Sequence, residues 1–320
     1  MKKIGVILFN LGGPDSLDAI EPFLYNLFRD PDIFKIPVGQ KLFAKVISRL
    51  RAPKVSEEYK LIGGKSPINE WTETQRKMLE NNLRKEHNDI DIDVLLAMRY
   101  WKPLTEETVK KVESNNYDRL ILLPLYPHYS ISTTGSSFNE WKRYYKGDAD
   151  KLIYIENYQD NKKYIEAINQ RIDETLLKFP EDIRAEVQLV FSAHGTPMSM
   201  VRSGDPYSQH IKQTVELVMK ERNYSHEHHQ CYQSKVGPVK WLEPGTDTKI
   251  EELAANNKKH LLVIPISFVS DHVETLFELD IEYRHVADNA GIKNYIVMQG
   301  LNDSEIFIDS LTKLVNKKLN

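Results

Sequence analysis

The sequence contains a histidine and a row of carboxylates whose residue types suit proton exchange or the binding of a divalent metal. His194 follows the apolar run 187–192 and Ala193, and it precedes Gly195, so its side chain is expected to project from a strand tip. An imidazole in such a position can transfer protons near pH 7 or bind a borderline metal such as Fe(II). A structural histidine bonded to a nearby carbonyl group is the alternative interpretation.

The carboxylates belong to three glutamates at four-residue spacing, Glu274, Glu278 and Glu282. On an α-helix this spacing places all three on one face, and Ser270 or Asp271 is expected to cap the start of that helix. A line of carboxylates could guide a hard or borderline divalent cation, whereas a solvated acidic face is the alternative. His272 lies near the start of the same helix and is expected to face the same ligand as Glu274.

A hydroxyl-rich segment at 126–137 offers a different chemistry. It includes Tyr126, Ser130 and Thr133 and leads into an expected helix N-terminus, where anions bind readily. The segment lacks the lysine and the spacing of a phosphate-binding P-loop, and no Gly-x-Gly-x-x-Gly motif occurs, so nucleotide binding is not expected. Carboxylate recognition remains open, and Arg99 and Trp241 would add a cation and a flat apolar face.

Eight short apolar runs must position these residues: 4–10, 92–98, 119–125 and 152–155 in the first half, and 187–192, 230–232, 260–265 and 294–298 in the second. Runs that are apolar on both faces are typical of parallel strands covered by helices. The segments 72–85, 164–178 and 209–222 between them carry apolar residues at helical spacing. The alternation predicts an α/β fold with doubly wound parallel sheets.

The two halves of the chain resemble each other. Residues 6–14 and 189–197 both read as an apolar strand, a short polar tip, then glycine and proline. We therefore predict a duplicated βαβ domain, with the two copies in 1–160 and 161–300 and a helix in 301–320 that packs back on the first domain. Ligands of open α/β sheets bind beyond the carboxyl ends of the strands, where the candidate residues lie.

The composition of the 320-residue chain excludes several classes of protein. Lys+Arg 43 and Asp+Glu 46 give a net charge of 43 − 46 = −3, which argues against a nucleic-acid partner. No apolar stretch reaches the roughly 18 residues that span a bilayer, and the lone cysteine suggests a reducing, cytoplasmic setting. Residues 17–51 mix apolar and basic side chains, which suits either a transient contact with a lipid surface or an ordinary pair of amphipathic helices.

Other metal sites are not expected. The single cysteine, Cys231, excludes an intramolecular disulfide, a cysteine-ligated zinc site and an iron–sulfur cluster held by four cysteines of one chain. The histidine-rich tract 225–230 could be read as a metal site, but its place in a polar connection before a weak strand favours a solvated loop.

Several of these segments together resemble the ferrochelatase family. They are Ser192-Ala193-His194-Gly195-Thr196-Pro197 with Gly204-Asp205-Pro206-Tyr207, the blocks 231–242 and 268–276, Asn10-Leu11-Gly12-Gly13-Pro14, and Thr133-Thr134-Gly135-Ser136. The resemblance implies an enzyme that inserts Fe(II) into a porphyrin in the last step of haem biosynthesis. It also implies two Rossmann-like domains with the porphyrin in the cleft between them, and no organic cofactor.

The resemblance also implies roles for individual residues. His194 and Glu274 would be the central pair; His194 would accept the pyrrole protons and could bind iron, and the division of labour between the two is open. Glu278 and Glu282 would continue the acidic line for metal entry or proton exit. The residues that would bind the porphyrin or its propionates are Leu11, Arg99, Tyr126, Ser130, Thr133, Trp241, Phe268 and His272.

The substrate and the activity have alternatives. Family members that act on coproporphyrin III commonly carry a tyrosine where this chain has Leu11, so protoporphyrin IX is the expected substrate. With Cys231 alone, the [2Fe–2S] cluster of some relatives is not expected. The other readings are a coproporphyrin III ferrochelatase, a cobalt or nickel chelatase for a more hydrophilic tetrapyrrole, and a non-catalytic haem or porphyrin carrier.

Overall fold

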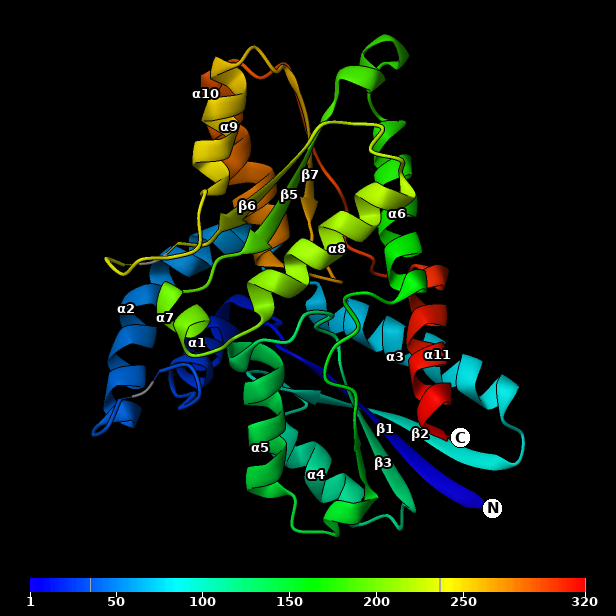
Figure 1. The fold of residues 1–320 in the computed structure, drawn as a ribbon. Helices are drawn as coiled ribbons and strands as arrows, with labels where there is room; N and C mark the ends of the chain where they lie inside the picture. Colours follow the sequence, from blue (N-terminus) through cyan, green and yellow to red (C-terminus); the bar gives the residue numbers. More distant parts are fainter. Residues whose placement is uncertain (35, 236, 320) are drawn as a thin grey trace. The chain divides into compact units, whose positions relative to one another are not determined.

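The computed structural model describes residues 1–34, 36–235 and 237–319, and the chain divides into two compact units. Unit 1 comprises Met1–Tyr158 and Asn302–Asn320, and unit 2 comprises Gln159–Leu301. Each unit is built on a four-stranded sheet, in the order β2-β1-β3-β4 and β6-β5-β7-β8 respectively. The order is the same in both when the strands are counted within each unit, so the predicted α/β fold with two similar parallel sheets is confirmed (Figure 1).

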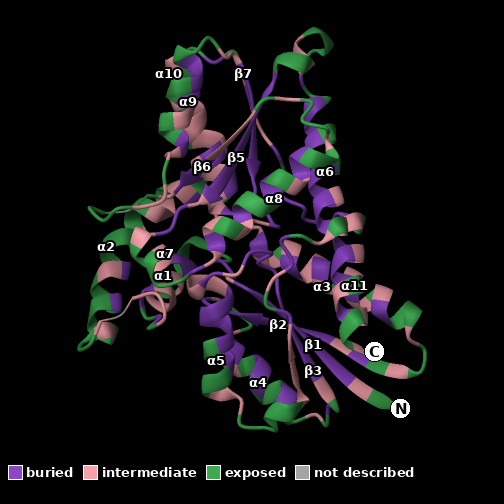
Figure 2. Cartoon of the chain, in the orientation of Figure 1, coloured by how far each residue is buried: buried purple, intermediate pink, exposed green. Residues whose placement is uncertain are grey.

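The sheet of unit 1 contains β1 (Lys2–Asn10), β2 (Ile90–Met98), β3 (Arg119–Pro124) and β4 (Leu152–Tyr154), all parallel. Its helices are α1 (Ile20–Phe28), α2 (Gln40–Leu61), α3 (Ile68–Glu86), α4 (Thr105–Glu113), α5 (Ser136–Tyr144) and α11 (Glu305–Leu319). On one face of the sheet, the ring of Phe9 packs edge-on against Phe138 and Trp141, with centroids 5.6 and 5.7 Å apart. Burial on both faces explains the apolar sequence of β1 (Figure 2).

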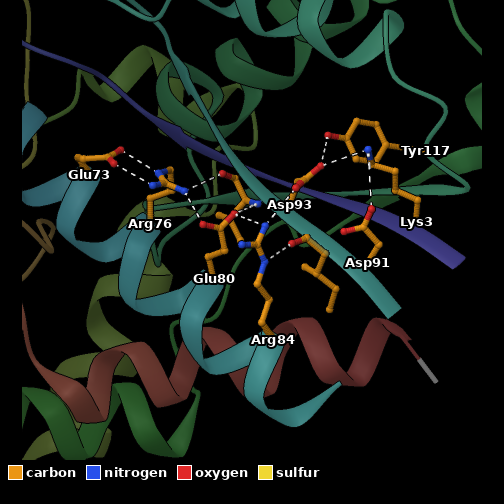
Figure 3. A network of polar contacts seen from close by, with 10 residues as sticks. Lys3, Glu73, Arg76, Glu80, Arg84, Asp91, Asp93 and Tyr117 are labelled. Atoms are coloured by element: carbon orange, nitrogen blue, oxygen red, sulfur yellow. Dashed lines mark hydrogen bonds and ion pairs between the residues drawn. The ribbon is translucent and has the colours of Figure 1, made fainter. Parts of the chain in front are cut away.

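A network of ion pairs joins α3 to the sheet of unit 1 (Figure 3). Arg76 contacts Glu73 at 2.8 Å and Glu80 at 3.0 Å on its own helix. Arg84 reaches Asp93 of β2 at 3.2 Å, and the Tyr117 hydroxyl donates to the same carboxylate at 2.8 Å. The charges of these carboxylates are therefore balanced by nearby arginines, and Asp93 also accepts a hydrogen bond from a hydroxyl group.

The sheet of unit 2 contains β5 (Gln188–His194), β6 (His228–Gln233), β7 (His260–Pro265) and β8 (Asn294–Val297). Its helices are α6 (Lys162–Leu176), α7 (Met198–Arg202), α8 (Tyr207–Glu221), α9 (Thr246–Ala255), the π-helix η5 (Glu274–Glu282) and α10 (Tyr283–Ala290). In Figure 1, α9 and α10 cover one face of this sheet, and α6 and α8 cover the other. All eight predicted strands are present; the bounds of β7 match the prediction, and one or both ends of each other strand differ from it by one or two residues.

Two of those shifts concern candidate residues. The strand predicted to end at residue 192 continues to His194, which pairs in register with Gln233 of β6. The histidine-rich tract is not a solvated loop throughout, because His228 and His229 lie in β6. His229 Nε2 contacts Gln188 Oε1 at 3.1 Å, and among the described residues no group of three or more metal-ligating side chains is arranged around an ion site.

Candidate functional site

His194 ends β5 with its ring held by a carboxylate. Its Nδ1 lies 2.8 Å from Glu274 Oε2, and its backbone N–H donates to Ser267 Oγ at 3.0 Å. Because Nδ1 is engaged with Glu274, Nε2 is the ring nitrogen left for another partner. The side chain is 38% exposed, so a ligand can reach it.

Gly195 allows the tips of β5 and β6 to approach closely. Its N–H donates to the carbonyl oxygen of Gln233 at 2.8 Å. A Cβ atom at this position would lie 2.6 Å from that oxygen and 3.3 Å from Cε3 of Trp241. A larger residue here would push the strand tips apart and move His194.

The segment predicted as an α-helix is the π-helix η5, which begins at Glu274. The residue before η5 is Val273, whose side chain makes no capping hydrogen bond, and capping of the segment by Ser270 or Asp271 stays a prediction. Asp271 Oδ1 accepts hydrogen bonds from Thr275 Oγ1 at 3.1 Å and from the N–H of Gly300 at 3.0 Å. Single-turn π segments are rare and often mark functional sites.

The wider turn of η5 still brings two of the three glutamates together. Four residues amount to slightly less than one π-helical turn, so Glu274 and Glu278 lie on the same face. Both accept from the side-chain nitrogen of Gln233, at 3.5 and 3.4 Å. Glu282 ends η5 in an exposed position.

Glu278 is held by several donors. Its Oε1 accepts from the N–H of Ser234 at 2.7 Å and from the hydroxyl of Tyr283 at 3.1 Å. Its Oε2 accepts from Ser234 Oγ at 2.6 Å. Neither Gln233 nor Ser234 was predicted as a site residue; their place at the end of β6 was the available signal.

The charges in this cluster shift one another's pKa values. Burial disfavours the charged imidazole, but the attraction and hydrogen bond of Glu274, together with the charge of Glu278, raise the pKa of His194. Burial opposes ionisation of Glu274, but His194 outweighs it and holds the pKa of that carboxyl well below its usual range. Burial and the neighbouring Glu274 raise the pKa of Glu278.

The cluster contains no arginine or lysine partner. In the part of the chain that the structure describes, the only ion-pair partners of Glu274 are His194 and His272, and Glu278 has none. His194, Glu274 and Glu278 do not close into a metal cage among the described residues. The arrangement suits proton exchange and an open, negatively charged approach for a cation.

His272 and Phe268 lie beside this cluster. The His272 side chain is buried, its Nδ1 contacts the carbonyl oxygen of Ser270 at 3.1 Å, and its Nε2 lies 4.0 Å from Glu274 Oε2. Burial lowers the pKa of His272, so its neutral form is favoured. The ring of Phe268 lies 4.3 Å from His272 and 6.3 Å from His194 between centroids.

Trp241 is brought to the same strand tip by a short backbone pairing. It forms an antiparallel bridge with Pro197, and the N–H of Leu242 donates to the carbonyl oxygen of Thr196 at 3.0 Å. Five predicted residues of unit 2 therefore gather around the end of β5: His194, Trp241, Phe268, His272 and Glu274. Glu278 is next to them, one turn along η5.

In unit 1, Arg99 is buried in a polar network. Its Nη2 lies 2.9 Å from Asp30 Oδ1, its Nη1 lies 3.3 Å from Glu140 Oε1, and its Nε donates to Ser136 Oγ at 2.8 Å. The hydroxyl of Tyr100 also donates to Asp30, at 2.7 Å. Three of the five guanidinium N–H groups are thus engaged within unit 1, which the sequence alone did not reveal.

The other candidates of unit 1 follow β1 and β3. Leu11 is half-buried at the tip of β1, where its carbonyl oxygen accepts from the N–H of Tyr100 at 2.9 Å. Tyr126 is buried, which raises the pKa of its hydroxyl well above the usual value. Ser130 caps a second π-helix, η2 (Ile131–Gly135), by accepting from the N–H of Ser132 at 3.2 Å, and Thr133 lies half-buried within η2.

Comparisons with known proteins show which family and fold the chain resembles. A family model described as Ferrochelatase matches residues 3–319. The chain is 47% identical over 320 residues to a protein named ferrochelatase from Geotalea uraniireducens (strain Rf4), covering 99% of this chain and 98% of the relative. It is 45% identical over 326 residues to a ferrochelatase from Gloeobacter violaceus (strain ATCC 29082 / PCC 7421), covering 100% and 98%.

Among solved structures, SirB from Bacillus subtilis with Fe3+ has a similar fold. The TM-score is 0.54 at 11% identity, covering 99% of this chain and 95% of that chain. A multi-domain protein from Deinococcus radiodurans with structural similarity to chelatases gives a TM-score of 0.53 at 10% identity, covering 97% of this chain and 54% of that chain. Both likenesses concern the fold alone.

Proposed function

The chain belongs to the ferrochelatase family, and from this membership we propose that it inserts Fe(II) into protoporphyrin IX to make protohaem. As a ferrochelatase it is a metal chelatase, a lyase of haem biosynthesis, whose substrates are a porphyrin and ferrous iron. The observation that carries the proposed mechanism is the 2.8 Å contact between His194 Nδ1 and Glu274 Oε2. The choice of protoporphyrin over coproporphyrin III rests on Leu11, which stands where coproporphyrin-specific members commonly carry tyrosine.

His194 is the proposed proton acceptor. Insertion replaces two pyrrole N–H protons by one ferrous ion, so two protons leave the porphyrin for each metal that enters. With Nδ1 held by Glu274, Nε2 carries the lone pair that accepts each proton in turn. Glu274 remains ionised and stabilises the imidazolium that forms, and the partly exposed ring then returns the proton to solvent.

The carboxylates of η5 are the proposed receptors of the ferrous ion. Carboxylate oxygens can replace part of the hydration shell of a divalent cation. Glu282 is exposed and Glu278 lies beside Glu274, so the three would accept the ion first at the surface and then next to the histidine. Among the described residues, no lysine or arginine pairs with Glu274 or Glu278, and the ion-pair partners of Glu274 are His194 and His272.

The porphyrin contacts are proposed from the chemistry of the side chains. Flat or apolar groups would pack on the macrocycle, and hydroxyl groups would donate to its propionates. The proposed residues are Leu11, Tyr126, Ser130, Thr133, Trp241, Phe268 and His272. Arg99 is proposed to assist chiefly by holding Ser136 at the start of α5, because it is buried and contacts that hydroxyl.

An anaerobic assay tests the function. Purified protein is given Fe(II) or Zn(II) with protoporphyrin IX or with coproporphyrin III, and metallation is followed by absorbance. We expect metallation of protoporphyrin IX at the higher kcat/KM. Preference for coproporphyrin III would overturn the assignment based on Leu11, and porphyrin binding without metallation would indicate a carrier.

We also propose a transient contact between α2 and an anionic membrane. Leu42, Val46 and Leu50 recur at four-residue spacing on α2 and are 68%, 50% and 71% exposed. The same stretch carries basic residues such as Lys41 and Lys45, and this combination is typical of helices that lie at a lipid surface. No helix in the described ranges is long and apolar enough to cross a bilayer. Sedimentation with phosphatidylglycerol vesicles should fall when Leu42 and Leu50 are replaced by serine.

Two further expectations complete the proposal. The enzyme is cytoplasmic, which cell fractionation tests. It carries no [2Fe–2S] cluster, because Cys231 is the single cysteine and its thiol is buried. Protein purified without air should therefore lack the visible absorption bands of such a cluster.

A further inference from the structure

Gln233 and Ser234, at the end of β6, contact the carboxylates of the site without being part of its proton chemistry. We infer that they are positioning residues that hold Glu278 beside Glu274 and thereby set the affinity of the enzyme for the metal ion rather than for the porphyrin. This inference rests on the proposed roles of the two glutamates. Its basis is the geometry of three elements, β5, β6 and η5.

Ser234 donates two hydrogen bonds to the carboxylate of Glu278. Its backbone N–H and its hydroxyl reach Oε1 and Oε2 at 2.7 and 2.6 Å, so both carboxylate oxygens are fixed by one residue. The backbone of Ser234 is left-handed, with φ 65°. This conformation is unfavourable for a residue that carries a Cβ atom, and it persists only where the surrounding contacts determine it. The contacts with Glu278 are such a determinant.

Gln233 connects the two glutamates. Its side-chain nitrogen lies 3.5 Å from Glu274 Oε2 and 3.4 Å from Glu278 Oε2. The charges of the two carboxylates repel each other, and no lysine or arginine in the described ranges offsets the repulsion. An amide group that donates to both offsets part of it and keeps Glu278 from turning away.

A buried hydroxyl group fixes the orientation of the Gln233 amide. Ser192 Oγ donates to its carbonyl oxygen at 3.0 Å, and Thr246 Oγ1 lies 2.8 Å from Ser192 Oγ. Cys231 Sγ follows at 3.3 Å from Thr246 Oγ1, and all of these side chains are buried. Since Ser192 donates to the amide oxygen, the amide nitrogen faces the glutamates. The lone cysteine thus lies at the back of a buried polar chain that ends at the site.

Register explains why this support reaches the site. His194 pairs with Gln233, and Ser192 pairs with Cys231, across β5 and β6. Residues paired across neighbouring strands, and residues two apart along a strand, have side chains on the same face of the sheet. The proton acceptor and the residue that positions the metal-binding carboxylates are therefore neighbours on one sheet face.

The first test replaces Gln233 by methionine, which keeps its length and removes both donors. With the porphyrin that the wild type uses, we expect the KM for Zn(II) or Fe(II) to rise about tenfold and the KM for the porphyrin to change less than about twofold. Gln188→Met is the matched control. Gln188 is buried like Gln233, but its side chain contacts His229 and no glutamate of the site. It begins β5, whereas His194 ends that strand.

Equal effects on both KM values, or the same change in Gln188→Met, would overturn the inference. If Gln233→Met does not fold, Ser192→Ala gives the same test. This substitution removes the hydrogen bond that fixes the oxygen of the Gln233 amide and changes no contact of a glutamate. A rise in the metal KM that is smaller than tenfold but still selective is expected there; no selectivity would count against the inference.

Ser234 is tested by a pair of variants. Ser234→Ala and Ser234→Gly both lose the hydroxyl, so both should raise the metal KM selectively. Only Ser234→Gly relieves the left-handed backbone, so it should unfold at a higher temperature than Ser234→Ala. A porphyrin-selective change in either variant would contradict the positioning role. Full activity of His194→Ala would instead refute the proposed proton acceptor. The selective change in the metal KM of the Ser234 variants could still be interpreted in that case.

Discussion

The segments that follow β3 and β7 occupy equivalent places in the two units but carry different chemistry. Each strand ends in proline, Pro124 or Pro265, and each is followed by a π-helix that leads into an α-helix, η2 into α5 and η5 into α10. The first segment presents hydroxyl groups and the second presents carboxylates. The same backbone plan thus offers donors suited to an anionic group in unit 1 and acceptors suited to protons or a cation in unit 2.

The carboxylates of unit 1 show what distinguishes those of η5. Glu73, Glu80 and Asp93 contact arginines at 2.8, 3.0 and 3.2 Å (Figure 3). By contrast, Glu278 accepts hydrogen bonds only from hydroxyl and N–H groups, and Glu274 contacts the imidazole of His194. A neutralised carboxylate supports packing, whereas one without a permanent cation keeps its charge available for a substrate ion. The following predictions test this contrast.

The largest effect is expected for His194→Ala. Removal of the proton acceptor should lower kcat by about 10²- to 10⁴-fold, because the imidazole Nε2 that accepts the pyrrole protons is lost, together with the Nδ1 contact to Glu274 Oε2 at 2.8 Å that orients the ring. Steady-state metallation of the porphyrin measures it. His226→Ala, in the histidine-rich tract, is the control and should retain wild-type kcat. Comparable rates for His194→Ala and the wild type would remove the histidine from the mechanism.

A smaller effect of the opposite selectivity is expected in unit 1. Ser130→Ala removes the hydroxyl that accepts from the N–H of Ser132 at 3.2 Å and loosens the start of η2. We expect the KM for the porphyrin to rise about three- to tenfold, equivalent to the loss of one hydrogen bond, with the metal KM unchanged. Ser114→Ala, on an exposed position after α4, is the control. A selective rise in the metal KM would break the contrast between the two segments.

The sequence was informative where burial determines the residue types. Strands β1 and β7 are buried along almost their whole length, so their apolar runs predicted them directly. Four-residue spacing could not distinguish η5 from an α-helix, since Glu274 and Glu278 share a face in either. The difference lies in backbone hydrogen bonds, which leave no periodic signal when the segment is short.

The contacts of individual site residues depended on partners distant in the chain. Arg99 could be recognised as a cation, but its burial against Asp30, which lies far from it in sequence, could not be predicted. Gln233 meets Glu278 only because of the register between β5 and β6 and the path of η5. An amide and a hydroxyl are common residue types, so nothing in their spacing indicated that they hold a carboxylate.

The third prediction concerns a neutralised network. Arg76→Met should lower the free energy of unfolding by about 1 kcal/mol, because it leaves Glu73 and Glu80 without their shared cation and removes a contact with the Val94 carbonyl oxygen. Urea unfolding measures the change. Both KM values should match the wild type. The Lys54 side chain is 81% exposed and lies 3.9 Å from its partner Glu58, so Lys54→Met should have no measurable effect.

The smallest effect is a shift in pH dependence. The acceptor must be neutral, so kcat rises with pH as His194 loses its proton, and the attraction of Glu274 and Glu278 moves this rise upward by raising the pKa of His194. Glu278→Gln removes one of these charges, so the acid limb of kcat should move to lower pH when metal is saturating. Profiles measured between about pH 5 and pH 9 give the direction. A shift to higher pH, or an unchanged acid limb, would mean that the charge of Glu278 does not raise the pKa of His194. The difference between the carboxylates of η5 and the arginine-paired carboxylates of unit 1 would then concern metal binding alone.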